Sequence, residues 1–351
     1  MKKLTLVLLL LVIGAAAASV WLYEKAHEPY RGYAAAEQFV EIPAGAGSRT
    51  IGERLVAAGI VRDTATYRVA LWLSGEARRL KAGEYRFDQP MTPAAVIDKL
   101  ARGEVYLIPV TFPEGLTIAE MSKIYEVHAL DMPSATPSPS PVADFIAASK
   151  NASLIHGLDP AARDLEGYLF PETYPLTRHT DAPRLIHMMI ERFEHVFTPE
   201  LRATAKARGL TVRQIVTLAS IVEKETARPE ERPLVAAVLF TRLRVGMALQ
   251  CDPTVIYALV RAGKKYDGNL HHDDLSFDSP YNTYRYTGLP PGPIAAPGRA
   301  SLEAVVHPSD KNYLYFVSRN DGSHVFARTL DEHNRNVQKY QVQFFRDKRN
   351  R

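Results

Sequence analysis

The sequence of 351 residues contains a single cysteine, Cys251, so it can form no internal disulfide. Cys251 lies near no obvious catalytic histidine in the sequence, and we expect it to be a small buried apolar residue rather than a nucleophile. The glycine-rich loop that cradles phosphate groups and the Gly-x-Ser-x-Gly elbow of serine hydrolases are both missing. The net charge is only +4 and is spread along the chain, which argues against a nucleic-acid-binding protein.

Metal-ligand patterns are also scarce. One cysteine cannot build a zinc site alone, and the run from His271 to Asp274 is the main candidate for a metal. Adjacent side chains in such a run do not converge on one face, and no second cluster of ligands accompanies them. We therefore predict a solvated loop at this position, with no metal and no cofactor.

The long apolar run of the chain lies at its N-terminus. Leu4 to Tyr23 follows two lysines and has about the 20 residues that span a bilayer as a helix. Positive charges before the span keep that end in the cytoplasm, which makes residues 1–3 a cytoplasmic tail. Small residues from Ala15 to Ser19 leave a cleaved signal peptide as the alternative, but the run exceeds a usual signal-peptide core. We expect an uncleaved anchor at 4–23, with the rest of the chain outside the cytoplasm.

The chain after the anchor divides into a small and a large part. We expect a polar tether at 24–37, then a small α+β module at 38–110. The predicted elements of the module are strands at 39–43, 82–87 and 105–112 and helices at 48–58, 63–74 and 92–102. Its strand, turn and helix pattern resembles the small glycan-binding LysM-like module. Proline and serine dominate 131–142, which predicts an insertion without a packed element.

Residues 111–347 form the larger part, for which we predict a mixed α/β domain. Its predicted helices lie near 143–150, 182–197, 211–226, 229–244 and 330–345, with a pair of strands at 312–317 and 323–327. From Asp252 onward the chain is rich in Tyr, Asn, Pro and Gly, which suggests loops on a rigid base. The overall class is therefore α+β, with an N-terminal transmembrane helix, the small module and this larger domain.

The helix that ends at Glu225 carries the main candidate for chemistry. Thr211 and Gln214 read as a capping box, and apolar residues then recur at helical spacing. At about 100° per residue, Leu218, Val222 and Glu225 fall along one stripe. Burial raises the pKa of a carboxyl group and makes it a general acid. The alternative is an ordinary helix-end glutamate paired with Lys224 or Arg228.

The region after this helix interleaves amide and hydroxyl side chains with aromatic rings. Such a mixture suits a sugar-binding groove, because rings stack on sugar faces while amides and hydroxyls meet sugar hydroxyls and N-acetyl groups. The candidate groove residues are Asp252, Asn282, Tyr284 and Thr287. The alternative is a loop-rich region in which Pro and Gly set the turns.

Taken together, these segments resemble the YceG-like endolytic murein transglycosylases, the MltG proteins. The resemblance covers nearly the whole chain, and its most specific motifs lie in the larger part. They are the segments 81–87, 166–174, 220–226, 238–247, 249–257, 281–284, 288–292, 307–308, 313–317, 324–326 and 333–334. The insertion at 131–142 lies outside the family pattern, and Cys251 stands where a small polar residue is expected.

The resemblance implies an inner-membrane enzyme with a periplasmic catalytic domain at 111–347, which cuts nascent peptidoglycan strands internally and so ends their elongation. It places the catalytic acid at Glu225 and leaves Glu223 a structural role. Neutral Glu225 would protonate the oxygen between N-acetylmuramic acid and N-acetylglucosamine, and its carboxylate would then deprotonate the muramic C6 hydroxyl, leaving a 1,6-anhydro end. The implied partners are peptidoglycan glycan strands and, within the cell-wall biogenesis machinery, peptidoglycan synthases.

Two other functions stay open at this point. A lysozyme-like hydrolase would need a positioned water and usually a second carboxylate, for which Asp252 is the best candidate. A non-catalytic adaptor would hold glycan through its N-terminal module and bind synthases through the rest.

Overall fold

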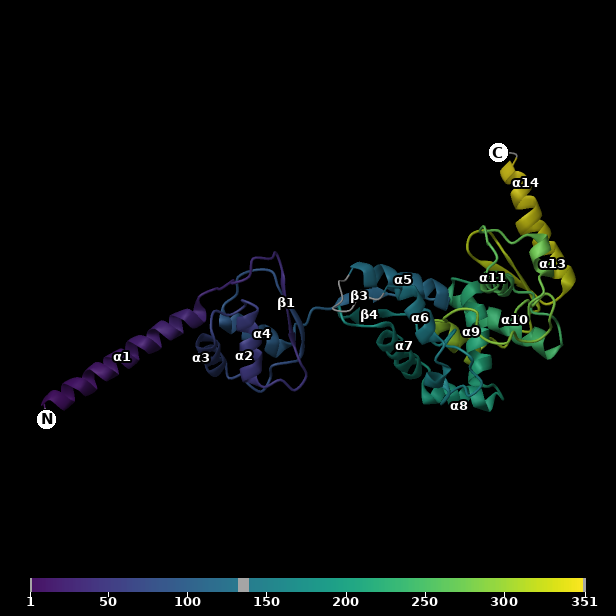
Figure 1. Ribbon diagram of the computed structural model, residues 1–351. Coiled ribbons are helices and arrows are strands. Elements are labelled where there is room, and N and C mark those ends of the chain that lie inside the picture. Colours follow the sequence, from purple (N-terminus) through teal and green to yellow (C-terminus); the bar gives the residue numbers. More distant parts are fainter. Residues whose placement is uncertain (1, 132–138, 350–351) are drawn as a thin grey trace. The chain divides into compact units, whose positions relative to one another are not determined.

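The structure is a computed structural model that describes residues 2–131 and 139–349. The chain divides after Ile108 into two compact units, each with its own core (Figure 1). Most of the predicted insertion, 132–138, lies outside the described residues, and Pro141 already begins a helix.

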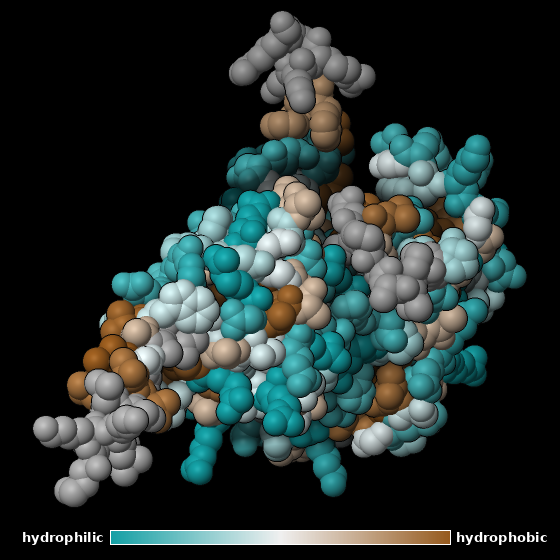
Figure 2. Space-filling view, turned by 60° about the vertical axis from the view of Figure 1, so that its left-hand side comes forward, coloured by the Kyte–Doolittle hydropathy of each residue, from teal (hydrophilic) through white to brown (hydrophobic). Residues whose placement is uncertain are grey.

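Helix α1 (Lys2–His27) contains the apolar run, and its segment Leu9–His27 is long and apolar enough to cross a membrane. A signal sequence would pass the same test. In Figure 2, the coloured part of α1 is largely brown, hydrophobic surface, while much of the face in view is hydrophilic. The predicted tether at 24–37 is partly wrong. Helix α1 continues to His27, Ala26 is buried, and the backbone N–H of Tyr30 donates to Met91 at 3.0 Å.

The first unit is built on a two-stranded antiparallel sheet, β1 (Gln38–Ile42) with β2 (Gly83–Phe87). Helices α2 (Ser48–Ala57), α3 (Thr64–Ser74) and α4 (Pro93–Arg102) accompany it (Figure 1). Local signals set these boundaries: Asp63 caps the backbone N–H of Thr66 at 2.8 Å, and left-handed Gly103 ends α4. The strands and helices bury one shared apolar core.

The strand predicted at 105–112 is shorter and has another partner. Strand β3 (Ile108–Thr111) pairs with β4 (Thr173–Leu176), and the hydroxyls of Thr111 and Thr173 lie 2.8 Å apart. The N–H of Phe112 continues the pairing by donating to the carbonyl of Glu172 at 2.9 Å. Local sequence predicts an extended conformation here, but the choice of partner depends on a segment some 60 residues away.

The second unit is largely helical. Its first helices are α5 (Ile118–Asp131), α6 (Pro141–Ser149), η1 (Ala152–Ile155), α7 (Ala182–Val196) and α8 (Pro199–Ala207). Next come α9 (Val212–Glu225), η2 (Pro229–Glu231), α10 (Arg232–Arg244), α11 (Asp252–Arg261), η3 (His272–Ser276) and α12 (Arg299–Val306). The last elements are the hairpin β5 (Tyr315–Ser318) and β6 (His324–Ala327), then α13 (Leu330–Val337), the π-helical turn η4 (Gln338–Gln343) and α14 (Phe344–Arg349).

The expectation of loops from Asp252 onward is wrong at two places, α11 and α12. Pro253 stands in the first turn of α11, where a missing N–H costs nothing because that turn has no internal acceptor to satisfy. Helix α8, which also begins with a proline, had not been predicted. In α8 and α11 the proline reads as a loop signal when it in fact stands in the first turn of a helix.

Helix α9 is the buried centre of this unit. The predicted capping box of Thr211 and Gln214 is confirmed, and α9 ends at Glu225, as Thr226 turns into extended backbone. Helices α8, α10, α11 and α12 all contact it. The proline-rich segment 290–298 runs alongside, where the N–H of Ile294 donates to the Ser220 hydroxyl at 3.0 Å. Close packing at this segment requires glycine at Gly167, which has φ +83° and no room for a Cβ beside Pro293.

Candidate active site

Glu225 is the last residue of α9 and has a partly exposed side chain. Burial raises the pKa of its carboxyl group to about 7, and the negative charge of Asp252 acts in the same direction. A hydrogen bond from Cys251 and the charge of Arg242 lower this pKa, but burial outweighs them. A carboxyl group in this state is about half protonated near neutral pH, which suits a general acid.

Arg242 reaches the neighbourhood of Glu225 from α10. It is almost fully buried, and its Nε and Nη1 donate to the carbonyls of Leu314 and Leu249 at 2.7 and 2.6 Å. These two bonds fix the guanidinium by joining α10 to the start of the β5 hairpin and to the chain before α11. The result is a fixed positive charge that favours the carboxylate form of Glu225 once it has given up its proton.

Cys251 also meets Glu225. The residue is buried, as expected, and burial raises the pKa of its thiol well above the usual value. Its backbone N–H donates to the Thr283 hydroxyl at 3.0 Å, which holds the thiol in place. Cys251 is therefore a protonated, weak hydrogen-bond donor beside Glu225, and its thiol donates to the carbonyl of Leu249 at 3.5 Å.

The two ion-pair partners suggested for Glu225 are engaged elsewhere. The Lys224 Nζ donates to the carbonyl of Gly115 at 3.1 Å. Arg228 donates from Nε to Gly322 at 3.1 Å and from Nη2 to Asp321 at 3.3 Å. The surroundings of Glu225 are thus those of a partly desolvated acid rather than a surface ion pair.

Two of the four groove candidates lie together near Glu225. The Tyr284 hydroxyl donates to Asp252 Oδ1 at 2.5 Å, and burial raises the pKa of Tyr284, with Asp252 adding to the effect. The charge of Asp252 raises the pKa of Glu225, and the charge of Glu225 in turn raises the pKa of Tyr284. Asp252 is exposed on the first turn of α11, and Thr287 is exposed on the following loop.

Asn282 has a different place from the one the sequence suggested. Its side chain is fully buried, and its amide nitrogen donates to the carbonyls of Leu275 and Phe277 at 3.0 and 2.8 Å. Its amide oxygen accepts the N–H of Tyr284 at 2.9 Å. The buried amide therefore holds the loop that presents Tyr284, and it is not exposed to a substrate.

Glu223 lies in a separate buried cluster on α9. Its Oε1 accepts from Arg232 at 2.8 Å, and its Oε2 accepts the backbone N–H of Gly298 at 2.9 Å. Glu114 joins the same arginine at 3.5 Å. Burial raises the pKa of Glu114, and the nearby Glu223 adds to the shift. Both oxygens of Glu223 thus serve to tie α9 to η2, α10 and the segment before α12.

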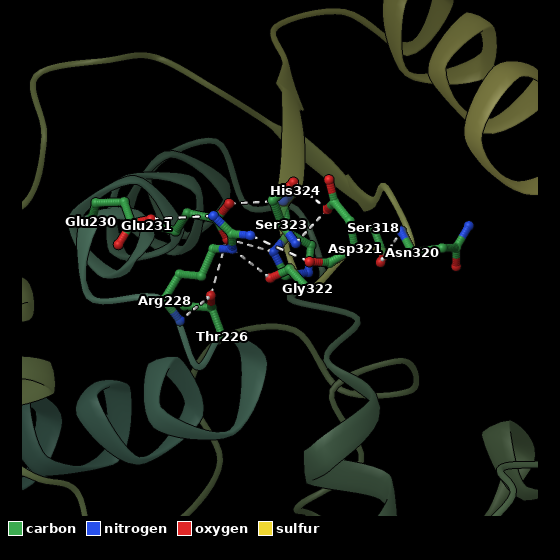
Figure 3. Close-up of polar contacts among 10 residues, drawn as sticks. All are labelled: Thr226, Arg228, Glu230, Glu231, Ser318, Asn320, Asp321, Gly322, Ser323 and His324. Carbon is green, nitrogen blue, oxygen red and sulfur yellow. Dashed lines mark hydrogen bonds and ion pairs between the residues drawn. The ribbon is translucent and has the colours of Figure 1, made fainter.

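The chain immediately after Glu225 is held to the β5–β6 hairpin (Figure 3). Thr226 donates through its hydroxyl to Glu231 Oε2 at 3.0 Å. Glu231 then binds His324, accepting the backbone N–H on Oε1 at 2.8 Å and contacting Nδ1 through Oε2 at 2.7 Å. With the two bonds from Arg228 to the hairpin turn, these contacts fix the backbone that follows the acid. We call Thr226, Arg228, Glu231 and His324 the hairpin clamp.

Sequence reasoning missed Arg242, Cys251 and Glu231 as neighbours of the site. One signal was present for Arg242, which continues the buried spacing of Val235, Val238 and Leu239 on α10. A charged residue on such a stripe is the same anomaly that pointed to Glu225.

Among residues 2–131 and 139–349, no group of three or more His, Cys, Asp or Glu side chains is placed to hold a metal ion.

The comparisons with known proteins match this arrangement to a family. The model of the YceG-like family matches residues 40–339, which cover most of both units and the whole of the site described above. The chain belongs to the YceG-like family.

Relatives within this family carry a functional name. The chain is 33% identical over 317 residues to the endolytic murein transglycosylase of Bacillus subtilis strain 168, covering 86% of this chain and 84% of the relative. It is 32% identical over 319 residues to that of Streptococcus pneumoniae strain D39, of which it spans only 57%. The crystal structure of a yceG-like protein from Listeria monocytogenes has 28% identity and a TM-score of 0.57, and covers 86% of this chain and 98% of its own.

Proposed function

We propose that this protein is an endolytic peptidoglycan lytic transglycosylase in which Glu225 is the catalytic acid. The observation that carries the proposal is the carboxyl group of Glu225, which burial keeps partly protonated at neutral pH at the end of a rigid helix. Relatives named endolytic murein transglycosylases support the choice of substrate.

The chemistry requires one carboxyl group in two roles. Glu225 first gives its proton to the glycosidic oxygen as the bond from C1 of N-acetylmuramic acid to that oxygen breaks. The carboxylate then takes the proton of the muramic C6 hydroxyl, whose oxygen bonds to C1 and closes the 1,6-anhydro ring. No water is consumed, and the acid returns to its starting state. The fixed charge of Arg242 favours the intermediate carboxylate.

A muramidase is the second candidate, because Asp252 supplies a carboxylate near Glu225. In such an enzyme water replaces the C6 hydroxyl, and a second carboxylate assists. The Tyr284 hydroxyl donates a short hydrogen bond to Oδ1 of Asp252. The other carboxylate oxygen, Oδ2, takes no part in this bond. The two reactions differ in their products: the lyase leaves anhydro ends and the hydrolase leaves reducing ends.

The apolar helix α1 supports a membrane location for this activity. We propose that residues 4–23 of this helix remain as a single-pass anchor in the inner membrane, with the N-terminus cytoplasmic and the residues after the anchor periplasmic. The catalytic domain would then act close to the membrane on newly made strands and end their elongation. Peptidoglycan synthases are the partners that this place suggests.

The test uses the full chain in detergent micelles with purified peptidoglycan strands and mass spectrometry of the products. We expect 1,6-anhydro ends from the wild type and a loss of roughly 10²- to 10⁴-fold in rate for Glu225→Gln. The matched control is Glu194→Gln on the exposed face of α7, which should leave the rate unchanged. Reducing ends would select the muramidase, and undiminished cleavage by Glu225→Gln would reject Glu225 as the acid. Binding without cleavage by the wild type would select the adaptor.

A further inference from the structure

A second concave site lies away from Glu225. A cavity of about 510 Å³ opens between the loop 161–168, the first turn of α9, the last turn of α11 and the loops 277–281 and 291–293. Its volume is in the range of small-ligand sites. Glu225, Cys251, Asp252 and Tyr284 are not among the residues that line it. The cavity is therefore separate from the site around Glu225.

A buried carboxyl group forms part of the cavity wall. Glu166 is 8% exposed, and its Oε1 accepts the backbone N–H of Ile118 at 3.1 Å, while its Oε2 accepts the Tyr257 hydroxyl at 3.2 Å. Burial raises the pKa of Glu166 to about 8, so this group is mostly neutral at pH 7. The wall therefore adds little negative charge to the cavity.

Among the charged side chains that the structure describes around the cavity, one arginine has no carboxylate partner. Three carboxylates are already paired: Asp159 with Arg213 at 2.9 Å, Asp164 with Arg261 at 3.7 Å, and Asp278 with Arg285 at 3.8 Å. Arg163 lines the same cavity and is exposed. Within the part of the chain that the structure describes, its side chain makes no hydrogen bond or ion pair. An anionic group is the ligand chemistry that this arrangement attracts.

Apart from Ser279, the remaining lining is largely apolar and aromatic. The guanidinium of Arg261 lies 5.5 Å from the ring centre of Tyr281, and the rings of Tyr281 and Tyr257 lie 4.9 Å apart. Further apolar surface comes from Ala258, Ala262, Phe277, Pro291 and Pro293. A ligand that fits this cavity has short aliphatic groups as well as a carboxylate, which describes a small acidic peptide.

We propose that the cavity binds the carboxylate-bearing peptide attached to the glycan strand, with Arg163 as its charged contact. This inference rests on the proposed function, because peptidoglycan sugars carry such peptides. Arg213 and Glu225 are twelve residues apart on α9, which is about 18 Å of helix. An extended peptide of five residues reaches roughly 17 Å. The two lengths are similar, so a five-residue peptide attached to a sugar near Glu225 has about the length needed to reach the cavity.

One loop joins the two sites. Tyr281 lines the cavity, and Tyr284, three residues later, donates to Asp252 beside the acid. Between the two tyrosines, the buried amide of Asn282 binds the carbonyl of Leu275 and the N–H of Tyr284. Peptide binding at the cavity would thus fix the same loop that presents Tyr284 to the active site.

The test compares two substrates on the full chain in detergent: glycan strands that carry peptides, and the same strands after an amidase has removed them. We expect Arg163→Ala to lower kcat/KM on peptide-bearing strands roughly 10-fold and to leave the peptide-free rate unchanged. Arg208→Ala, an exposed arginine at the end of α8, is the matched control and should change neither rate. Ala262→Phe should reduce the cavity and give the same selective loss by a steric route.

A binding measurement separates this inference from the proposed function. Calorimetry with the free peptides released by the amidase uses the Glu225→Gln variant and needs no cleavage. We expect saturable binding that Arg163→Ala weakens by a similar factor. If Arg163→Ala and the wild type cleave both substrates alike and no peptide binds, the inference is wrong and the cavity serves another ligand, such as an acidic segment of a protein partner, while the lyase activity stands. If peptide binds but no strand is cleaved, the proposed function fails and the site remains.

Discussion

Glu231 binds His324 with both of its carboxylate oxygens, at 2.8 Å to the backbone N–H and 2.7 Å to Nδ1, although the residues are 93 positions apart in the sequence. The same carboxylate accepts the hydroxyl of Thr226, which follows the catalytic candidate directly. The last turn of α9 and the β5–β6 hairpin are therefore fixed to each other. The position of Glu225 depends on this joint as well as on the helix that carries it.

His324→Ala should weaken the hairpin clamp. The variant leaves the buried Glu231 carboxylate with an unmet hydrogen bond, which we expect to cost about 1–3 kcal/mol of unfolding free energy. We also expect a fall in kcat, because the backbone after Glu225 is no longer held. His324→Asn retains a donor at the position of Nδ1 and should restore most of both quantities. Thermal unfolding and single-turnover rates check this, and equal losses in the two variants would contradict the role of the Nδ1 contact.

The pH dependence of kcat/KM should follow the acid form of Glu225. Burial raises its pKa to about 7, so the rate should fall as pH rises through that value. The Cys251 hydrogen bond lowers this pKa, and Cys251→Ala should therefore move the fall to higher pH. Initial rates between pH 5 and 9 test both statements. A rate that stays level up to pH 9, or a shift to lower pH in the cysteine variant, would rule out this assignment.

Glu225→Gln should stabilise the fold at alkaline pH. The pKa of Glu225 is raised in the folded chain from an ordinary 4.5 to about 7, so the folded state holds the extra proton and wild-type stability declines as pH rises from 4.5 past 7. The full loss is at most about 3 kcal/mol, and glutamine does not titrate. Denaturant unfolding at pH 5 and pH 8 should show the variant gaining on the wild type only at pH 8. A difference that is the same at both pH values would refute the raised pKa.

Asn282→Asp tests the support of the Tyr284 loop. The change turns an amide nitrogen that donates to two carbonyls into an acceptor that faces them, and we expect a loss of about 2–3 kcal/mol. Tyr284 should then lose its fixed contact with Asp252, and KM should rise. Thr287→Ala, in an exposed residue nearby, is the comparison and should leave the unfolding temperature unchanged. Calorimetry and steady-state kinetics measure both, and a fully stable Asn282→Asp protein would show that the buried amide is not needed.

Local sequence signals were enough for much of the fold. The apolar run predicts α1, and the capping box of Thr211 and Gln214 predicts the start of α9. The helical spacing of α9 places Glu225 on the same stripe as Leu218 and Val222, which made it a candidate. These features were predictable because they depend on residues within one or two turns of each other.

Other assignments failed where two local signals conflict or where the partner is distant. Pro253 reads as a loop residue but begins α11, and the strand near β3 finds its partner in β4. Asn282 reads as a groove residue because amides often bind sugars, yet its amide is buried beneath the loop. No local rule decides whether a polar side chain meets a ligand or the protein's own carbonyls.

The sequence by itself therefore determined the helix, its cap and the position of Glu225 in line with the apolar residues Leu218 and Val222. Only the tertiary structure decided that the carboxyl group of this residue meets Arg242 and Cys251, and that Glu231 and His324 hold the chain behind it. The physical reason is that helix formation depends on neighbouring residues, whereas desolvation and charge depend on what the folded chain brings together from α10, the start of α11 and the hairpin. The raised pKa of Glu225 belongs to that second kind of property.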